Sequence, residues 1–226
     1  MTTVFIISAP SGSGKSTLVK KVRDIVPNLE FSISYTTRNL RGVEENGREY
    51  YFITREEFEK MVRNDEFLEH AEVFGNYYGT ARTFLRKAET DGTDLLLDID
   101  VQGAEQIKRK LPEAVSIFIL PPNRSELERR LRERGQDDEE TIQRRLSTAR
   151  REIENYAKYD YILVNDRLPD SVDLLEAILL SERLKRGGKA DAALSTKAEM
   201  CRLDKMRERL RPILQSFRET AARGGQ

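Results

Sequence analysis

Apolar residues along this chain come in short runs that alternate with helical patterns. Residues 3–8 (TVFIIS) form an apolar run of strand length, and from Lys15 to Val26 apolar residues recur at the spacing of one helix face. Further strands are expected within 31–38, 67–80, 94–100, 114–120 and 159–166, with helical patterns between them. Repeated helix–strand alternation predicts an α/β fold with a central parallel sheet flanked by helices.

Local signals predict where several of these elements begin and end. Thr54 and Glu57 form a capping box, so a helix is expected to start at Arg55. The pattern at 81–92 predicts a helix that ends at Gly92, and the closing helix is expected to end at Gly187. Within 67–80, the letters NYYG at 76–79 are interpreted as a tight turn. Residues 125–155 are expected to be helical and highly charged, with a break near 135–138.

Composition excludes several classes of protein. Charged residues make up 35% of the 226 residues, but 39 basic and 39 acidic side chains cancel, which leaves no net field favouring nucleic acid or membrane. With one cysteine, Cys201, and one histidine, His70, the chain offers neither an internal disulfide nor a Ser/His/Asp triad. No apolar run is long enough for a membrane span, and TVFIIS is too short for a signal peptide. We therefore expect a cytoplasmic protein.

The last part of the chain differs from the rest in charge. Residues 189–226 carry nine Lys/Arg against five Asp/Glu. Apolar residues there follow a two-heptad seam, which Pro212 interrupts: Leu203, Met206, Leu210, Ile213 and Phe217. A helix packed on its own domain, or a partly disordered tail, is favoured over a coiled-coil arm that supports self-association. An anion-binding tail is a third interpretation.

A glycine-rich turn follows the first strand and opens the first helix. Gly14, Lys15 and Ser16 fit the second half of the phosphate-loop pattern, whereas Ala9 stands where the first glycine is usual. Backbone N–H groups, the helix N-terminus and the Lys15 ammonium all favour an anion, and the Ser16 hydroxyl can ligate Mg²⁺. We therefore predict that this turn binds the phosphates of a nucleoside triphosphate. The nucleotide-binding residues are Ala9, Pro10, Ser11, Gly12, Ser13, Gly14, Lys15, Ser16 and Thr17.

Two aspartates end the strand predicted at 94–100. Ligands of parallel α/β sheets bind outside the carboxyl ends of the strands, so Asp98 and Asp100 are expected to face the same crevice as Lys15.

Six motifs in order resemble the guanylate kinase family over roughly residues 3–184: SAPSGSGKST, SYTTRNLRGVEENGREYYF, FLEHAEVFGNYYGT, LLLDIDVQGA, RLRERGQ and YILVND. The resemblance implies a P-loop kinase domain over 1–187. It would contain a small GMP-binding flap at about 34–92 and a helical lid at about 125–155, and residues 188–226 would form a C-terminal helical extension. The implied activity is phosphorylation of GMP to GDP by ATP with Mg²⁺, with dGMP phosphorylated in the same way, in guanine nucleotide metabolism. Membrane and nucleic acid are not expected partners.

The resemblance also assigns roles to residues of the flap. Guanine presents N1–H and a 2-amino group as donors, and a carboxylate at Glu69 matches them, with Ser34, Thr80 and Asp100 completing the base site. The GMP phosphate would be held by Arg38, Arg41, Tyr50 and Tyr78.

The remaining implied roles concern phosphoryl transfer. Lys15, Arg134 and Arg145 would neutralise charge on the transferring phosphoryl group. Asp98 would orient water on a Mg²⁺ ion bound by Ser16.

Other charged residues have plainer interpretations. Arg129, Arg130, Arg132 and Arg144 are interpreted as a solvated helix face, and Glu44 and Arg48 as part of a solvated loop. His70 is given no role, because it would point to the other face of its strand from Glu69.

Two other functions remain open at this point. One is a catalytically inactive interaction module of the same fold, although such modules lack an intact phosphate loop. The other is a kinase of a sugar phosphate, which would keep Lys15 without needing Glu69 or Thr80.

Overall fold

The computed structural model describes residues 2–73, 75–133 and 138–218. Its larger sheet has five strands in the order β2-β7-β1-β8-β9. The strands are β1 (Val4–Ser8), β2 (Leu29–Ser32), β7 (Asp94–Asp98), β8 (Val115–Leu120) and β9 (Tyr161–Val164). β2 pairs with β7, and β8 with β9, in parallel. Every residue of β1, β8 and β9 is buried, as expected for a sheet covered on both faces.

Helices lie between these strands in the chain and also follow the last one, so the predicted α/β alternation is confirmed. They are α1 (Lys15–Ile25), α2 (Arg55–Arg63), α3 (Arg82–Asp91), α4 (Val101–Lys110), α5 (Arg124–Glu133), α6 (Glu139–Ile153), α7 (Leu168–Arg186), α8 (Ala192–Glu199) and α9 (Leu203–Arg218). A short 3-10 helix, η1, spans Tyr156–Lys158.

The chain divides into two compact units. Unit 1 comprises Met1–Ile6 and Pro27–Val115, and unit 2 comprises Ile7–Val26 and Ser116–Gln226. The phosphate loop, α5 and α6 belong to unit 2, whereas the flap belongs to unit 1.

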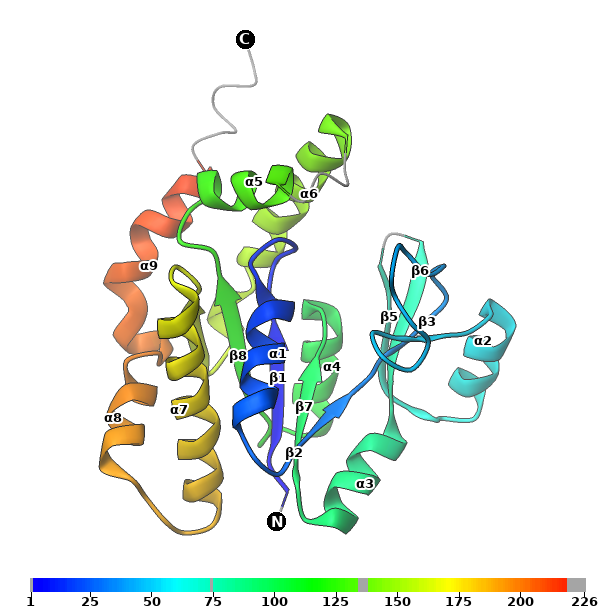
Figure 1. Ribbon diagram of the computed structural model, residues 1–226, viewed down its shortest axis with the longest axis horizontal. Helices are drawn as coiled ribbons and strands as arrows, with labels where there is room; N and C mark the ends of the chain where they lie inside the picture. The colour runs from blue at the N-terminus through cyan, green and yellow to red at the C-terminus, as the bar shows by residue number, and fades with distance from the viewer. Residues whose placement is uncertain (1, 74, 134–137, 219–226) are drawn as a thin grey trace. The chain divides into compact units, whose positions relative to one another are not determined.

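The flap in unit 1 contains a second sheet, of four strands in the order β4-β3-β6-β5 (Figure 1). These are β3 (Tyr35–Thr36), β4 (Tyr51–Phe52), β5 (Phe67–Val73) and β6 (Asn76–Ala81). Buried Phe58 of α2 stacks on Phe67 of β5 at 4.6 Å between ring centroids, which anchors α2 to this sheet. The predicted capping box of α2 is present, since Thr54 accepts from the N–H of Glu57 and Glu57 accepts from that of Thr54.

Two details of the flap differ from the sequence predictions. The single strand predicted at 31–38 is two strands in two sheets, because β2 pairs with β7 and β3 pairs with β6. The tight turn predicted at 76–79 is wrong, because these residues belong to β6. Val73 is paired with Asn76, so the chain reverses direction before Asn76.

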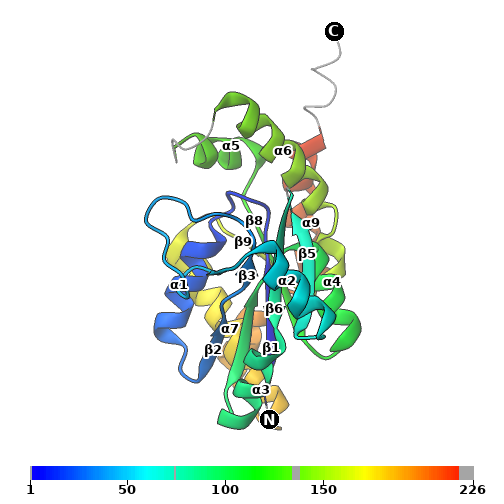
Figure 2. The same ribbon diagram turned by 90° about the vertical axis from the view of Figure 1, so that its right-hand side faces the viewer.

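Unit 2 includes the C-terminal extension. Helix α8 packs along α7, and α9 packs against α5, α6 and β9 (Figures 1 and 2). The N–H of Ile162 in β9 donates to the Cys201 carbonyl at 2.7 Å, so the segment between α8 and α9 covers the edge strand of the large sheet. The predicted ends at Gly92 and Gly187 are confirmed for α3 and α7.

The apolar seam of the extension is buried within unit 2. Met206, Leu210, Ile213 and Phe217 are each at most 5% exposed. Pro212 lies inside α9 without ending it, on the exposed side of the helix. Residues 203–218 therefore form a helix whose apolar face is packed within unit 2, whereas self-association through the extension stays a prediction.

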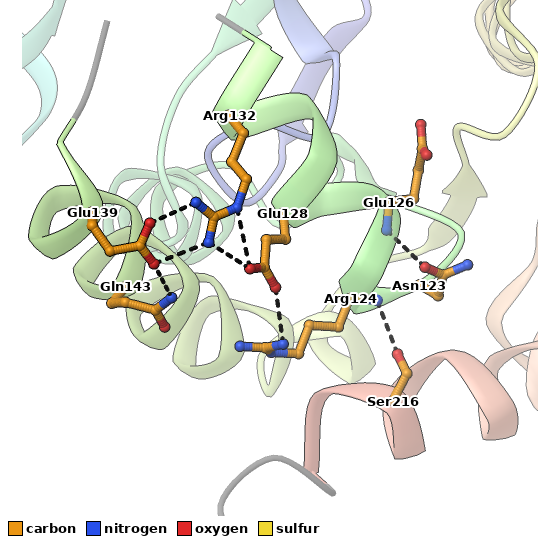
Figure 3. A network of polar contacts seen from close by, with 8 residues as sticks. All are labelled: Asn123, Arg124, Glu126, Glu128, Arg132, Glu139, Gln143 and Ser216. Atoms are coloured by element: carbon orange, nitrogen blue, oxygen red, sulfur yellow. Dashed lines mark hydrogen bonds and ion pairs between the residues drawn. The ribbon is translucent and has the colours of Figure 1, made fainter. Parts of the chain in front are cut away.

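A chain of polar contacts joins α9 to α5 and α6 (Figure 3). The backbone N–H of Arg124 donates to the Ser216 hydroxyl at 3.1 Å, and the Arg124 side chain contacts Glu128. Arg132 then bridges Glu128 and Glu139, at 2.9 Å and 2.5 Å, which ties α5 to the first turn of α6. The extension thus contacts the first residue of α5.

Candidate functional site

The phosphate loop in unit 2 has the backbone that its sequence requires. Gly12 and Gly14 take φ of 92° and 86°, in the left-handed region that favours glycine, and the Ser13 N–H closes a turn on the Pro10 carbonyl at 3.1 Å. Helix α1 starts at Lys15, so its first N–H groups lack intrahelical acceptors. Lys15 is half-buried, and Ser16 and Thr17 are exposed. This arrangement offers N–H donors, a cation and two hydroxyls to an anion.

Two side chains from other segments of unit 2 donate hydrogen bonds to the backbone of the loop. The Asn165 amide, directly after β9, donates to the Ser13 carbonyl at 2.8 Å. The Arg130 guanidinium of α5 donates to the same carbonyl at 3.3 Å and to the Asn165 carbonyl at 3.0 Å. A Cβ on Gly14 would lie 2.4 Å from the Asn165 amide nitrogen. A side chain at position 14 would therefore displace the Asn165 amide. Glycine is required here both for this contact and for the left-handed backbone conformation.

Arg130 was interpreted as part of a solvated helix face, and that interpretation is wrong. Its side chain is 20% exposed and contacts the loop, whereas those of Arg129 and Arg132 are 55% and 45% exposed and pair with glutamates along the helices. Charge pattern could not distinguish the three arginines. Asn165 was missed as well, although its place directly after a buried strand is a signal for a site residue.

The two predicted lid arginines have different outcomes. Arg145 lies on α6 and is half-buried. Arg134 lies outside the described residues, which end at 133 and resume at 138.

In unit 1, the predicted base site is built around a buried carboxylate. Glu69 of β5 is 3% exposed, and the Thr80 hydroxyl of the neighbouring strand β6 donates to its Oε1 at 2.7 Å. His70 is exposed, so the prediction that it points away from Glu69 is confirmed. Ser34 is 9% exposed, and its carbonyl accepts the Tyr51 N–H at 2.9 Å.

Gly103 brings two of the predicted base-site carboxylates together. It lies in the first turn of α4, and its N–H donates to Asp100 Oδ1, the cap of that helix, at 2.8 Å. A Cβ on Gly103 would lie 2.4 Å from Glu69 Oε2 and 3.3 Å from Asp100 Oδ1. The absence of a side chain at 103 therefore makes room for the Glu69 carboxylate, a role that no sequence pattern indicated.

Burial changes the acidity of this carboxylate. Loss of solvent raises the pKa of Glu69 from 4.5 to about 7, and the negative charge of Asp100 adds to the increase, whereas the Thr80 hydrogen bond opposes it. A buried carboxyl whose pKa lies near neutrality is typical of a binding or catalytic site.

The predicted phosphate-binding residues of the flap lie around Arg38. Its side chain is 9% exposed, with the guanidinium carbon 5.4 Å from the Tyr50 ring centroid and 5.5 Å from that of Phe52. The Tyr50 and Tyr78 rings meet edge to face at 5.8 Å, and Arg41 is exposed. Four of the predicted residues thus come from one loop and the adjacent strand β6.

The interpretation of Glu44 as a solvated loop residue is wrong. Its carboxylate pairs with Arg38 through both oxygens, at 2.8 Å and 3.0 Å, and this contact lowers its pKa. Arg48 is 50% exposed, which agrees with its interpretation.

The donors available to Mg²⁺ are oxygens. Ser16 offers a hydroxyl in unit 2, and Asp98, at the end of β7 in unit 1, offers a half-buried carboxylate. Among the described residues no three His, Cys, Asp or Glu gather into a metal site. Mg²⁺ commonly takes one or two protein oxygens together with substrate phosphates and water, so each of these two side chains is of a type that can serve it.

Comparisons with known proteins agree on one family. The guanylate kinase family model matches residues 1–182. A guanylate kinase of Koribacter versatilis is 56% identical over 224 residues, which is 96% of this chain and 96% of that protein. One of Escherichia coli is 49% identical over 185 residues, covering 81% of this chain and 89% of that protein. The crystal structure of guanylate kinase from Anaplasma phagocytophilum matches with a TM-score of 0.69 and 38% identity, over 81% of this chain and 87% of that one.

The similarity to the Koribacter protein reaches well into the C-terminal extension, which the family model does not include. Within the described part of the chain, no helix is both long and apolar enough to cross a membrane.

Proposed function

The chain belongs to the guanylate kinase family and is an ATP:GMP phosphotransferase, and on that premise we propose which of its residues hold each substrate. Unit 1 holds GMP and unit 2 holds ATP. The phosphate loop, whose backbone suits a nucleotide, argues against an inactive interaction module, which would not need it.

The guanine base binds to Glu69, with Thr80, Ser34 and Asp100. The observation that carries this assignment is a carboxylate that is 3% exposed, oriented by the Thr80 hydroxyl and given room by Gly103. Guanine would donate N1–H and its 2-amino group to such a carboxylate. Adenine has an acceptor at N1, and a buried polar group left unmatched can produce roughly 10⁴–10⁵-fold discrimination.

The phosphate of GMP binds to Arg38, Arg41, Tyr50 and Tyr78. A guanidinium offers paired donors to phosphate oxygens, and the two hydroxyls add single donors. The proximity of Arg38, Tyr50 and Tyr78 supports this group. dGMP is proposed as a second acceptor, because it carries the same base and the same phosphate as GMP.

The phosphates of ATP bind to the loop from Ala9 to Thr17. Lys15 contacts the phosphoryl group that is transferred, and Asn165 and Arg130 keep the loop in shape through the Ser13 carbonyl. Ser16 would ligate Mg²⁺, and Asp98 would hold a water molecule of that ion. When bound, Mg²⁺ supplies positive charge to the ATP oxygens.

Transfer needs alignment and charge stabilisation, and no side chain acts as a nucleophile. An oxygen of the GMP phosphate bonds to the γ-phosphorus while the bond to the β–γ bridging oxygen breaks, and ADP leaves with that electron pair. Arg145 and Arg134 stabilise the charge that develops. Such arginines contribute roughly 10³–10⁵ in rate in phosphoryl transfer enzymes. A cytoplasmic location fits a kinase that uses ATP.

Two variants, assayed with GMP, AMP and a phosphosugar, test these assignments. Lys15→Ala removes a cation from the loop without removing core packing, so turnover should fall with any acceptor while the melting temperature stays within a few degrees. Glu69→Gln should raise KM for GMP and leave KM for ATP unchanged, because the amide cannot accept both guanine donors. Full GMP use by Glu69→Gln would refute the base assignment. Phosphosugar turnover exceeding that of GMP in the unmodified protein would favour a sugar-phosphate kinase.

A further inference from the structure

The Glu44 carboxylate in the flap loop contacts both the Arg38 guanidinium and the backbone of the loop. Its Oε1 accepts from Arg38 Nη2 at 2.8 Å, and its Oε2 accepts from Arg38 Nη1 at 3.0 Å. Arg38 Nη1 also donates to the Asn39 carbonyl at 2.6 Å. The end of the guanidinium, formed by its two Nη atoms, is therefore engaged by the loop itself.

The same carboxylate fixes the backbone at Arg41. The Arg41 N–H donates to Glu44 Oε2 at 2.8 Å, and the Glu44 N–H donates back to the Arg41 carbonyl at 3.1 Å. This reciprocal pair closes a turn over residues 41–44. Glu44 thus contacts both arginines assigned to the acceptor phosphate. It binds the side chain of Arg38 and the backbone of Arg41.

A guanidinium has five N–H donors, and its Nε–H and one Nη2–H lie on a separate side edge. The contacts to Glu44 and Asn39 leave that edge for another acceptor. A phosphate bound there would receive two parallel N–H bonds, the arrangement in which arginine holds phosphate most strongly.

We propose that Glu44 is a positioning residue for the acceptor phosphate: it holds Arg38 by the end of its guanidinium, presents the side edge to the phosphate, and fixes Arg41 through the 41–44 turn. This inference rests on the proposed binding of the GMP phosphate by Arg38 and Arg41.

A competing role for Glu44, as an occupant of the phosphate site, would have the opposite effect on GMP affinity. If the Glu44 carboxylate occupied the phosphate's own place and were displaced by it, removing the negative charge would strengthen GMP binding. The turn argues for positioning, because the Glu44 backbone N–H also donates to the Arg41 carbonyl, and a phosphate dianion has no donor with which to make that contact.

The test measures binding of GMP and of guanosine to the full chain by calorimetry. Glu44→Gln keeps the size of the side chain but loses its charge and one acceptor, so GMP should bind roughly 10- to 100-fold more weakly. Guanosine has no phosphate and should bind within about twofold of the unmodified protein. In assays, KM for GMP should rise while KM for ATP stays the same.

The flap loop contains a matched control. Glu49 also pairs with an arginine, Arg48 Nε at 2.6 Å, and also accepts a backbone N–H, that of Glu45 at 2.9 Å, but Arg48 is 50% exposed and is not assigned to the phosphate. Glu49→Gln should leave both affinities unchanged. Glu44→Asp, which keeps the charge on a shorter side chain, should lose GMP affinity as Glu44→Gln does, and it serves as the test should the Gln variant not fold.

Tighter GMP binding by Glu44→Gln, an unchanged affinity, or an equal loss of guanosine binding would each overturn the inference. Arg38→Ala separates this failure from that of the proposed function. If Arg38→Ala weakens GMP binding and Glu44→Gln does not, only the positioning role is wrong. If neither does, the phosphate assignment is wrong as well.

Discussion

At the scale of single residues, residue type indicated the chemistry, and environment decided which residues can perform it. Glu69 and Glu44 are both glutamates of the flap. Glu69 is 3% exposed and accepts a hydrogen bond from a hydroxyl, whereas Glu44 pairs with a guanidinium. Arg130 and Arg132 are two residues apart on α5, yet only Arg130 contacts the phosphate loop. These differences depend on which elements pack nearby, and a charge pattern along one helix contains no such information.

The pKa of Glu69, about 7, predicts how base binding depends on pH. Guanine donors need the carboxylate, so guanosine affinity should rise about tenfold per unit as pH increases towards 7, and then level off. Guanosine is the better probe because the GMP phosphate itself titrates near pH 6. Two neighbouring charges also act on the pKa of Glu69: that of Asp100 raises it and that of Lys110 lowers it. Calorimetry between pH 5.5 and 8 measures the effect, and Glu69→Gln should show none.

The same shift has a defined sign for stability. The folded protein holds a proton on Glu69 that the unfolded chain releases near pH 4.5. The contribution of this carboxyl to folding is therefore full below that pH and is lost as pH rises through 7. Urea unfolding of the unmodified protein and of Glu69→Gln should diverge over this interval, and parallel pH profiles would contradict the raised pKa.

At the scale of elements, caps and periodicity predicted helices better than they predicted strands. The capping box at Thr54, the end of α3 at Gly92 and the end of α7 at Gly187 are all local signals, and all were confirmed. The division of 31–38 into β2 and β3, and the strand at 76–79, were missed. Strand pairing joins residues far apart in the chain, so a local pattern cannot specify it.

The extension offers a prediction for a whole element. Phe217 of α9 is 4% exposed, so Phe217→Ala should lower the free energy of unfolding by about 3–5 kcal/mol, because it leaves a cavity in unit 2. Glu208→Ala on the same helix, with a side chain 85% exposed, should change it by less than about 0.5 kcal/mol. Urea denaturation measures both. A loss at Phe217 as small as that at Glu208 would mean that α9 is not packed as described.

At the scale of the whole molecule, the substrates are assigned to two compact units. The phosphate loop lies in unit 2 and the flap in unit 1. The sequence predicts that Asp98 and Asp100 face the same cleft as Lys15, and phosphoryl transfer requires the two bound phosphates to meet in line. This cleft stays a prediction.

A bisubstrate ligand tests that prediction. Adenosine and guanosine joined through a 5′,5′-oligophosphate should bind at least about 10²-fold more tightly than ATP or GMP, because the second contact is then intramolecular. Lys15→Ala and Glu69→Gln should each weaken binding of the joined ligand, as measured by calorimetry. If the joined ligand binds no better than ATP alone, the two sites do not meet in one cleft.

The sequence alone determined the helices and their caps, the phosphate loop, the family and the types of residue in each predicted site, because these depend on contacts between near neighbours or on motifs that occur in order. Tertiary structure decided the two-sheet arrangement, the room that Gly103 leaves for Glu69, the support of the loop by Asn165 and Arg130, and the place of the extension on β9 and α5. Each of these depends on burial and close approach between distant segments, and both arise only when the chain is folded.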